Sequence, residues 1–256
     1  MTFAGHDPGG GAGIQADIEA LASQGCHAAP VLTALTVQDS HDVYEFLALD
    51  PEHVRRQARA VLEDMPVAAF KTGMLGNSDI VEVIHAILQD YPDVPLVLDP
   101  VLASGNATEL GDSGLPDSIR QLLLPRATVV TPNSPEARRL APEGDTLDAC
   151  ACAMLDRGAQ YVLVTGTHER TRHVDNTLYH GHERLESFRW DRLPHSYHGS
   201  GCTLAASLAG LLAHGVDVLE ACHEAQRYTW EALSQGYRPG MGQHLPDRLF
   251  WSREQD

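Results

Sequence analysis

The sequence has almost no lysine: Lys71 is the only one in 256 residues, and apart from the 14 histidines every other basic side chain is an arginine. Lysine and arginine together number 18 against 35 acidic residues, which gives a formal charge of −17 at neutral pH. A chain with this charge repels a phosphate backbone, so the composition disfavours nucleic-acid binding.

Long apolar runs are also missing. The longest, at 95–98 and 161–165, are as long as a strand and far shorter than the roughly 20 residues that cross a bilayer. The first residues show no basic region followed by an apolar stretch, because glycines begin at Gly5. We therefore expect a cytoplasmic protein with no contact with a membrane.

Cysteines are few and odd in number. Five of them in a chain expected to be intracellular argue against a disulfide framework. Cys150 and Cys152 are one residue apart and have no matching pair of ligands, so a zinc site is not expected. Since 43% of the residues are hydrophobic, the chain can bury a large core, and we expect one α/β domain over 1–256.

Apolar runs alternate with amphipathic segments along most of the chain, which is typical of a parallel sheet with helices on both faces. The pattern predicts strands at 1–4, 28–37, 43–49, 68–72, 96–99, 128–131 and 161–165. It predicts helices at 13–23, 51–64, 78–89, 113–123, 134–140 and 146–157. Beyond these, 173–179 and 184–190 alternate as an antiparallel hairpin that ends the sheet, and helices follow at 202–213 and 216–234.

Ligands of open α/β sheets bind at the carboxyl ends of the strands, and the first such junction is rich in glycine. It runs from Gly5 through Asp7 to a helix that contains Asp17. Glycines and a helix start let backbone amides approach a ligand. The loop could bind a dinucleotide or a phosphate, or could be a flexible turn. It has neither a Walker lysine nor a well-spaced GxGxxG motif, which weakens the first two interpretations.

A second glycine-rich junction, His198-Gly199-Ser200-Gly201-Cys202, lies between the hairpin and a long helix. Consecutive amides at a helix start form an anion hole suited to a phosphoryl group in transfer. Cys202 falls in the first turn, where the helix dipole favours the thiolate. The simpler alternative is a glycine-rich helix start with a buried cysteine.

Acidic residues stand at two further junctions. Asn133 and Glu136 are three residues apart, so they fit a capping box, and Glu136 could instead orient a metal-bound water. Asp99 ends a strand before a proline, where it could hold a metal or simply terminate the strand. Together these junctions bring glycines, two acids and a candidate base to one edge of one sheet.

Six segments occur in the order AGHDPGGGAGIQAD, LTALTVQ, KTGML, LDPV, TPNSPE and HGSGCTLAASLA. In order and spacing the chain resembles the hydroxymethylpyrimidine and phosphomethylpyrimidine kinases over nearly its whole length. The resemblance implies a single ribokinase-like domain, ATP with Mg²⁺, and transfer of the γ-phosphoryl group to an aminopyrimidine alcohol and then to its phosphate, in thiamine biosynthesis. It also implies a homodimer.

The resemblance assigns roles to individual residues. Asp17 and Gln38 match polar contacts to the aminopyrimidine, Met74 and Val101 match its apolar walls, and Gly5 and Asp7 belong to the same substrate loop. The anion hole corresponds to Gly199, Ser200, Gly201 and Cys202, with Cys202 as the base. Asn133, Glu136 and Asp99 match the magnesium and phosphate motif, while Thr165, Gly166 and His168 match the segment beside the nucleotide.

The chain departs from the family pattern at two places. Only four residues precede Gly5, which indicates either a truncated first strand or a misassigned start. The loop 102–105 lacks a lysine that many relatives have there. Three alternatives stay open: a pyridoxal kinase of the same superfamily, a pyrimidine-binding sensor without catalysis, and a nicotinamide-dependent oxidoreductase. Gln38 and Met74 favour the pyrimidine over pyridoxal. Asp99, Glu136 and Cys202 together argue against a sensor, and the missing loop fingerprint argues against the oxidoreductase.

Overall fold

The computed structural model describes residues 1–105 and 108–253, and the strands of this part form one sheet in the order β3-β2-β1-β4-β5-β6-β7-β8-β9. The strands are β1 Thr2–His6, β2 Pro30–Gln38, β3 Val43–Ala48, β4 Phe70–Thr72, β5 Leu96–Leu98, β6 Val129–Val130, β7 Tyr161–Val164, β8 His173–His180 and β9 Glu183–Asp191. The six strands from β2 to β7 in this order are parallel, and β3, β8 and β9 pair antiparallel.

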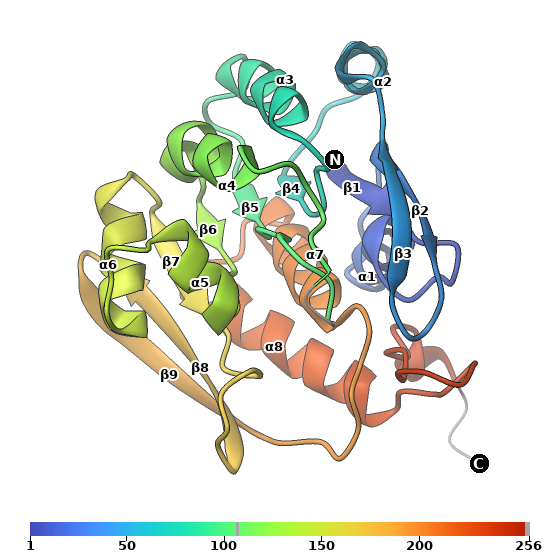
Figure 1. Ribbon diagram of the computed structural model, residues 1–256, viewed down its shortest axis with the longest axis vertical. Helices are drawn as coiled ribbons and strands as arrows, with labels where there is room; N and C mark the ends of the chain where they lie inside the picture. Colours follow the sequence, from blue (N-terminus) through green and yellow to red (C-terminus); the bar gives the residue numbers. More distant parts are fainter. Residues whose placement is uncertain (106–107, 254–256) are drawn as a thin grey trace.

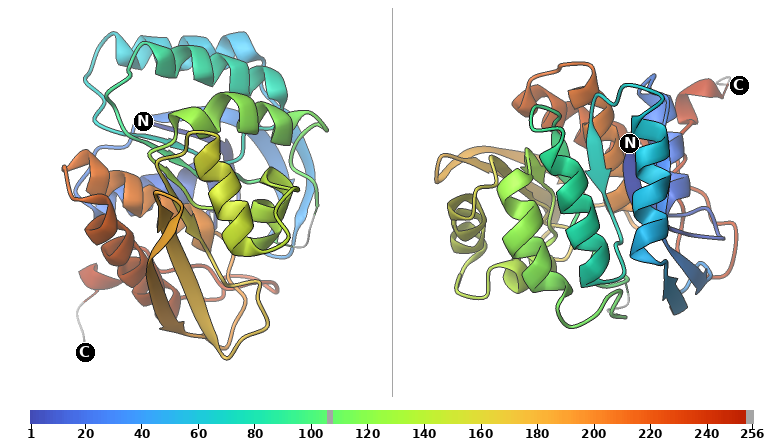
Figure 2. Two further views of the ribbon diagram at one scale, coloured as in Figure 1. Left: turned by 90° about the vertical axis from the view of Figure 1, so that its left-hand side faces the viewer. Right: turned by 90° about the horizontal axis from the view of Figure 1, so that it is seen from above.

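Helices cover both faces of the sheet (Figures 1 and 2). One face carries α2 Pro51–Leu62, α3 Ser78–Gln89, α4 Leu115–Ser118, α5 Ser134–Leu140 and α6 Leu147–Asp156, and the other carries α1 Gly13–Ser23, α7 Ser200–Ala213 and α8 Val218–Ser234. Successive side chains of a strand point to opposite faces of the sheet, so each strand contributes to the hydrophobic core on both faces. In β5, Leu96 and Leu98 pack with the first group of helices, while Val97 packs with α7 and α8.

The fold confirms the predicted α/β class with its antiparallel hairpin at one edge. β3 adds a second antiparallel edge that the alternation did not predict, because a short turn returns the chain from β2. The hairpin turn lies between the two predicted strands: His180 pairs with Glu183, and Gly181 and His182 take φ of 58° and 66°. Two positive φ values match the right-handed twist of the flanking strands.

Two predicted elements differ in form. The helix expected at 113–123 is short: α4 passes into a π-helical turn, η1 Ile119–Leu123, and then a 3-10 turn, η2 Leu124–Arg126. Pro125 supplies no backbone donor, so the chain cannot continue as an α-helix there. The first strand, expected to be truncated, has five residues and pairs on both sides, with β2 and β4.

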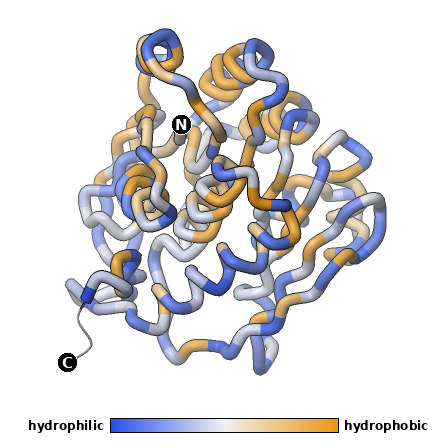
Figure 3. The backbone as a smooth tube through the Cα atoms, turned by 180° about the vertical axis from the view of Figure 1, so that it is seen from behind, coloured by the Kyte–Doolittle hydropathy of each residue, from blue (hydrophilic) through white to orange (hydrophobic). Residues whose placement is uncertain are grey.

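The longest helices are α7 and α8. α7 is apolar along most of its length (Figure 3), because it packs between the sheet, α1 and α8. Within the described residues, no helix combines the length and the apolar character needed to cross a membrane. The parallel strands all end at one edge of the sheet, where the loops after β1, β4, β5, β6 and β7 meet the start of α7.

Candidate active site

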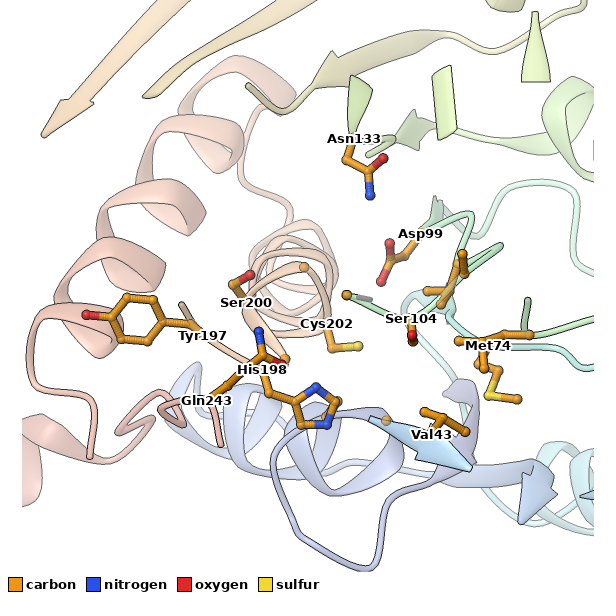
Figure 4. Close-up of a pocket in the computed structure, with 18 of the residues that line it drawn as sticks. Val43, Met74, Asp99, Ser104, Asn133, Tyr197, His198, Ser200, Cys202 and Gln243 are labelled. Carbon is orange, nitrogen blue, oxygen red and sulfur yellow. The ribbon is translucent and has the colours of Figure 1, made fainter. Parts of the chain in front are cut away.

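A cavity of about 420 Å³ opens at this edge of the sheet (Figure 4). Most of the residues predicted for the site line it: Gly5, Gln38, Met74, Asp99, Val101, Asn133, Glu136, Thr165, His168, Gly199, Ser200, Gly201 and Cys202. Asp7, Asp17 and Gly166 are not among its lining residues. The structure thus brings together seven separate segments of the chain, and the assigned roles stay predictions.

The start of α7 and the glycine loop after β1 touch through their backbones. Gly199 caps α7 with φ of 86°, and a Cβ atom there would lie 1.8 Å from the carbonyl oxygen of Gly11. Only glycine fits both the conformation and the close approach. The contact aims the first amides of α7 at the cavity, and such amides favour an anion because they have no partner within the helix.

Cys202 lies in the first turn of α7, beside the cavity (Figure 4). Burial raises the pKa of its thiol to about 11, and the nearby Lys71 charge opposes this only in part. The expectation that the helix start would favour the thiolate is therefore wrong for the ligand-free chain. Desolvation penalises the thiolate more than the charge of Lys71 and the backbone amide of Gly13 stabilise it.

Beneath the cavity lies a buried ion pair between β4 and α1. Lys71 Nζ lies 2.8 and 3.0 Å from the two carboxylate oxygens of Asp17, and both side chains are completely buried. Thr2 donates a hydrogen bond to the same carboxylate. Asp17 thus lies beneath the cavity wall and is not among the lining residues, so the structure gives no support to its predicted contact with the pyrimidine. The sequence signal for this pair was Lys71, the chain's single lysine, within the segment KTGML.

Asp99 stands between the ion pair and the cavity. Its Oδ2 is 4.0 Å from Lys71 Nζ, and among the described residues this buried oxygen has no hydrogen-bond partner. Burial raises the pKa of Asp99 to about 6, while Lys71 opposes the rise. The hydroxyl of Thr131, also on the cavity wall, is likewise buried without a partner. A buried polar group in this state is a candidate ligand contact.

Glu136 takes part in the capping box that its spacing predicted. Its carboxylate accepts a hydrogen bond from the Asn133 amide at 2.9 Å, and Asn133 Oδ1 accepts one from the Glu136 amide at 2.9 Å. The side chain also lines the cavity. Burial, and secondly the charge of Asp99, raise the pKa of Glu136 to about 8. A carboxyl with a raised pKa beside a cavity is typical of a functional site.

The two carboxyls and the Thr131 hydroxyl are oxygen donors of the kind that Mg²⁺ prefers. Within the described residues, no three His, Cys, Asp or Glu side chains gather closely enough to hold a metal by themselves. The donor set therefore fits a Mg²⁺ ion that keeps several waters and takes its other ligands from substrate phosphates.

Asp7 stabilises the glycine loop through hydrogen bonds to its backbone. Its side chain is 2% exposed, and its oxygens accept hydrogen bonds from the amides of Gly9 at 2.7 Å and Ala12 at 2.8 Å. It also lies 2.9 Å from His198 Nε2. This corrects its expected place in the substrate pocket, because it reaches the cavity only through His198.

Gly166 is also buried and does not line the cavity. Its amide donates to Asn176 Oδ1 at 2.9 Å, and a Cβ atom would lie 2.2 Å from the carbonyl oxygen of Asp175. The residue fixes the turn after β7, while its neighbours Thr165 and His168 line the cavity. Its glycine is required for close packing and not for contact with a ligand.

Arg248 is a component that the sequence analysis missed. It is 2% exposed; its Nε donates to Thr203 Oγ1 at 2.8 Å, and its guanidinium also contacts the Gly11 carbonyl and Glu19. It therefore ties the chain's last segment to the glycine loop and to α7. No motif marks it, because its partners lie far away in the sequence.

At the other end, the cavity is walled by Met74, Val101 and Val43. Gln38 Nε2 donates to Thr36 Oγ1 at 2.7 Å, and Thr36 donates to the carbonyl oxygen of His6 at 2.8 Å. This chain of bonds orients the Gln38 amide. A flat apolar ring with polar edges fits such a pocket, because an amide offers both a donor and an acceptor.

A second cavity of about 110 Å³ adjoins the first, and both are lined by Thr167, His195, Tyr197, Leu204 and Leu233. Trp190 and Trp230, 6.4 Å apart between ring centroids, line its far side. Gln226 accepts hydrogen bonds there from Asn176 and Trp190. The two cavities form one path from an apolar pocket past an anion site to an aromatic pocket.

Comparison with known proteins agrees with this geometry. The phosphomethylpyrimidine kinase family matches residues 7–247. A hydroxymethylpyrimidine/phosphomethylpyrimidine kinase from Streptomyces coelicolor is 39% identical over 94% of this chain and 91% of that protein. A chloroplastic bifunctional enzyme of thiamine biosynthesis from Arabidopsis thaliana is 35% identical over 100% of this chain and 51% of that protein. An ADP complex of Bacillus subtilis pyridoxal kinase superposes with a TM-score of 0.87, at 30% identity and 96% coverage of both chains.

Proposed function

The chain belongs to the phosphomethylpyrimidine kinase family, and from this premise we propose that it phosphorylates 4-amino-5-hydroxymethyl-2-methylpyrimidine and then converts the monophosphate to the diphosphate. It is a kinase of thiamine biosynthesis, as its relatives are. The observation that carries the proposal is the path of two joined cavities, with the amides of α7 at its centre.

Each part of the path suits one part of the reaction. The pyrimidine lies between Met74 and Val101 with its polar edge at Gln38, and the phosphoryl group in transfer lies at Gly199 to Cys202. ATP extends past Asn133, Thr165 and His168, with its base in the aromatic pocket. Phosphoryl transfer is catalysed mainly by positioning and electrostatics, so this arrangement supplies most of what the reaction needs.

Mg²⁺ would be held through Asp99 and Glu136 and by the phosphates of the nucleotide. It would offset phosphate charge in a cavity whose two carboxyl groups otherwise repel an anion. The unpartnered Oδ2 of Asp99 supports this assignment. Cys202 is the proposed acceptor of the hydroxyl proton as a thiolate, so its thiol, which burial keeps protonated at neutral pH, must first release its own proton to solvent.

A homodimer is proposed through the edge strand. Apolar side chains of β2 and β3 are exposed to solvent, namely Val37, Tyr44 and Leu47 at 56%, 64% and 62%. Apolar groups gathered at a sheet edge are typical of an interface. Sedimentation of the wild type and of Leu47→Glu tests this: the wild type should sediment as a dimer and the variant as a monomer.

The test of the function is a side-by-side assay of hydroxymethylpyrimidine and pyridoxal with ATP and Mg²⁺. We expect the higher kcat/KM for the pyrimidine and formation of the diphosphate on longer incubation. A higher kcat/KM for pyridoxal would instead favour a pyridoxal kinase. The structural similarity to a pyridoxal kinase is the observation that supports this second candidate. No consumption of ATP with either compound would contradict both.

A further inference from the structure

The main cavity presents no lysine or arginine to an anionic ligand. Among the described residues that line it, the side chains able to carry positive charge are His6, His168, His195 and His198. The proposed substrates are a nucleotide and a phosphate monoester, and Asp99 and Glu136 face the same space. If Mg²⁺ accompanies the nucleotide, the phosphate of the second substrate still needs a cation of its own.

The permanent cations closest to the cavity are engaged elsewhere. Lys71 is completely buried against Asp17, and Arg248 donates to Thr203, Glu19 and the backbone of the glycine loop. Neither lines the cavity. A histidine must therefore supply positive charge if a protein side chain does so.

His198 differs from the other three because a buried carboxylate fixes its ring. Its Nε2 lies 2.9 Å from Asp7 Oδ2, and its side chain is 21% exposed. Burial opposes ionisation of Asp7, but the hydrogen bonds from His198, Ala12 and Gly9 lower its pKa below the usual value. The ring also packs on Gly11, where a Cβ atom would lie 2.5 Å from His198 Cδ2.

An ionised carboxylate only accepts hydrogen bonds, so the Nε2 atom of His198 carries a hydrogen. The neutral ring then presents a lone pair at Nδ1, which repels a phosphate oxygen, whereas the protonated ring presents an N–H donor there. No group among the described residues makes a hydrogen bond with Nδ1. The ring projects toward the cavity below Cys202 (Figure 4), close in sequence to the first amides of α7.

We propose that His198 binds the phosphate group of the monophosphorylated substrate and takes up a proton from solvent when that group binds. The inference rests on the proposed function, because it concerns the acceptor of the second phosphorylation. Asp7 acts as a positioning residue that holds the ring with Nδ1 free. Binding of the monophosphate then weakens as the pH rises, while binding of the uncharged alcohol does not.

Other titratable groups surround this site: His6 on β1, Asp99 after β5, Glu136 on α5, Cys202 on α7, His195 and Tyr197 on the preceding loop, and His244 and Arg248 on the final segment. Only Asp7 is bonded to the ring of His198 in the described structure. His195 stacks on His244 with ring centroids 4.0 Å apart and has no carboxylate partner. It therefore provides a matched comparison within the same cavity.

Metal-free calorimetric titrations of the wild type with the pyrimidine alcohol and with its monophosphate test the inference. Buffers of different ionisation enthalpy at about pH 7.5 count the protons taken up, since free imidazole is mostly neutral there. We expect uptake with the monophosphate and none with the alcohol. His198→Gln keeps a donor toward Asp7 but cannot be protonated. It should lose the uptake and bind the monophosphate about 10- to 100-fold more weakly, with the alcohol unaffected.

His195→Gln is the control and should keep the proton uptake. Proton uptake by His198→Gln equal to that of the wild type would overturn the inference, and loss of uptake in His195→Gln alone would do the same. Should His198→Gln fold poorly, the wild type and Glu136→Gln decide together: in both proteins the preference for monophosphate over alcohol must fall between about pH 7 and 8.5, so that ionisation of Glu136 does not account for the fall. These outcomes leave the proposed function intact, because that depends on binding and phosphorylation of the alcohol.

Discussion

At the scale of single residues, Cys202 separates a catalytic interpretation of the α7 start from a structural one. Cys202→Ser should lower kcat on the hydroxymethyl substrate about 10²-fold, because a positioned base contributes on that order. The loss on the monophosphate should be smaller, since a phosphate oxygen is already ionised near neutral pH. Steady-state assays of both steps measure this. Full activity on the alcohol would mean that the residue only packs.

The pKa of Cys202, about 11, adds a pH test of the same role. A thiolate base becomes more abundant as the pH rises toward that value, so wild-type kcat on the alcohol should increase through the alkaline range. Cys202→Ser should remove this increase. A flat wild-type profile would contradict a thiolate base.

Gln38 tests the pyrimidine pocket. Gln38→Leu keeps most of the volume but leaves the polar edge of the ring unpaired, so pyrimidine binding should weaken by about 1–3 kcal/mol. Calorimetry with the alcohol measures the change. Thr36→Val is the matched comparison, because it removes only the hydroxyl that orients the amide, and its effect should be smaller. Unchanged affinity in Gln38→Leu would show that the pyrimidine binds elsewhere.

Glu136 tests the magnesium assignment. Glu136→Gln preserves the capping box, since glutamine caps as well as glutamate does, but it removes the charge. We expect activity to fall at limiting Mg²⁺ and to recover partly at high Mg²⁺. An unchanged Mg²⁺ dependence together with a lower melting temperature would support a structural role alone.

At the scale of elements, the ion pair between Lys71 of β4 and Asp17 of α1 fastens a helix to the sheet below the cavity. Lys71→Met leaves the buried Asp17 carboxylate without a cation, with only the hydrogen bond from Thr2, and should cost about 3–5 kcal/mol of unfolding free energy. Asp17→Asn should also destabilise the chain, and the double variant should lose less than the two single losses combined. Urea unfolding measures the cycle. Strict additivity would mean that the pair contributes no interaction of its own.

The exposed pair Arg227 and Glu224 on α8 provides a comparison for that cycle. Arg227→Met should change stability by less than about 1 kcal/mol, because solvent screens an exposed pair. The difference between the two sites isolates the effect of burial.

The elements were largely predictable because hydrophobic periodicity is a local property. α1, α3 and α5 have the predicted bounds, whereas β3 pairs antiparallel because a turn, and not the strand's own pattern, sets its direction. The position of the candidate site residues at strand ends was predictable for the same reason, whereas their roles stay predictions. Arg248 was not, since its bond to the Gly11 carbonyl spans 237 positions. The predicted direction of the Cys202 pKa shift was wrong, because burial depends on packing that no local motif encodes.

At the scale of the whole molecule, two buried carboxyls link stability to pH. Glu136 has a pKa of about 8 in the fold against an ordinary 4.5, and Asp99 about 6 against 3.8. The unfolded chain therefore loses these protons first as the pH rises, so the folded state binds more protons, and its stability falls from about pH 4, where the unfolded carboxyls ionise, to about pH 8, where Glu136 ionises in the fold. Thermal unfolding of the ligand-free chain measures this, and Glu136→Gln should flatten the upper part of the decline. Equal slopes in both proteins would contradict the assignment.

The single lysine also determines how the chain reacts with acylating reagents. Lys71 Nζ is completely buried, and the amino group of Met1 donates to the Ala69 carbonyl inside the same region. An amine-reactive ester should therefore leave Lys71 unmodified while the fold is intact and acylate it only when β4 separates from α1. The rate of Lys71 acylation, followed by mass spectrometry, would then measure the rate at which this region opens, without any inserted probe.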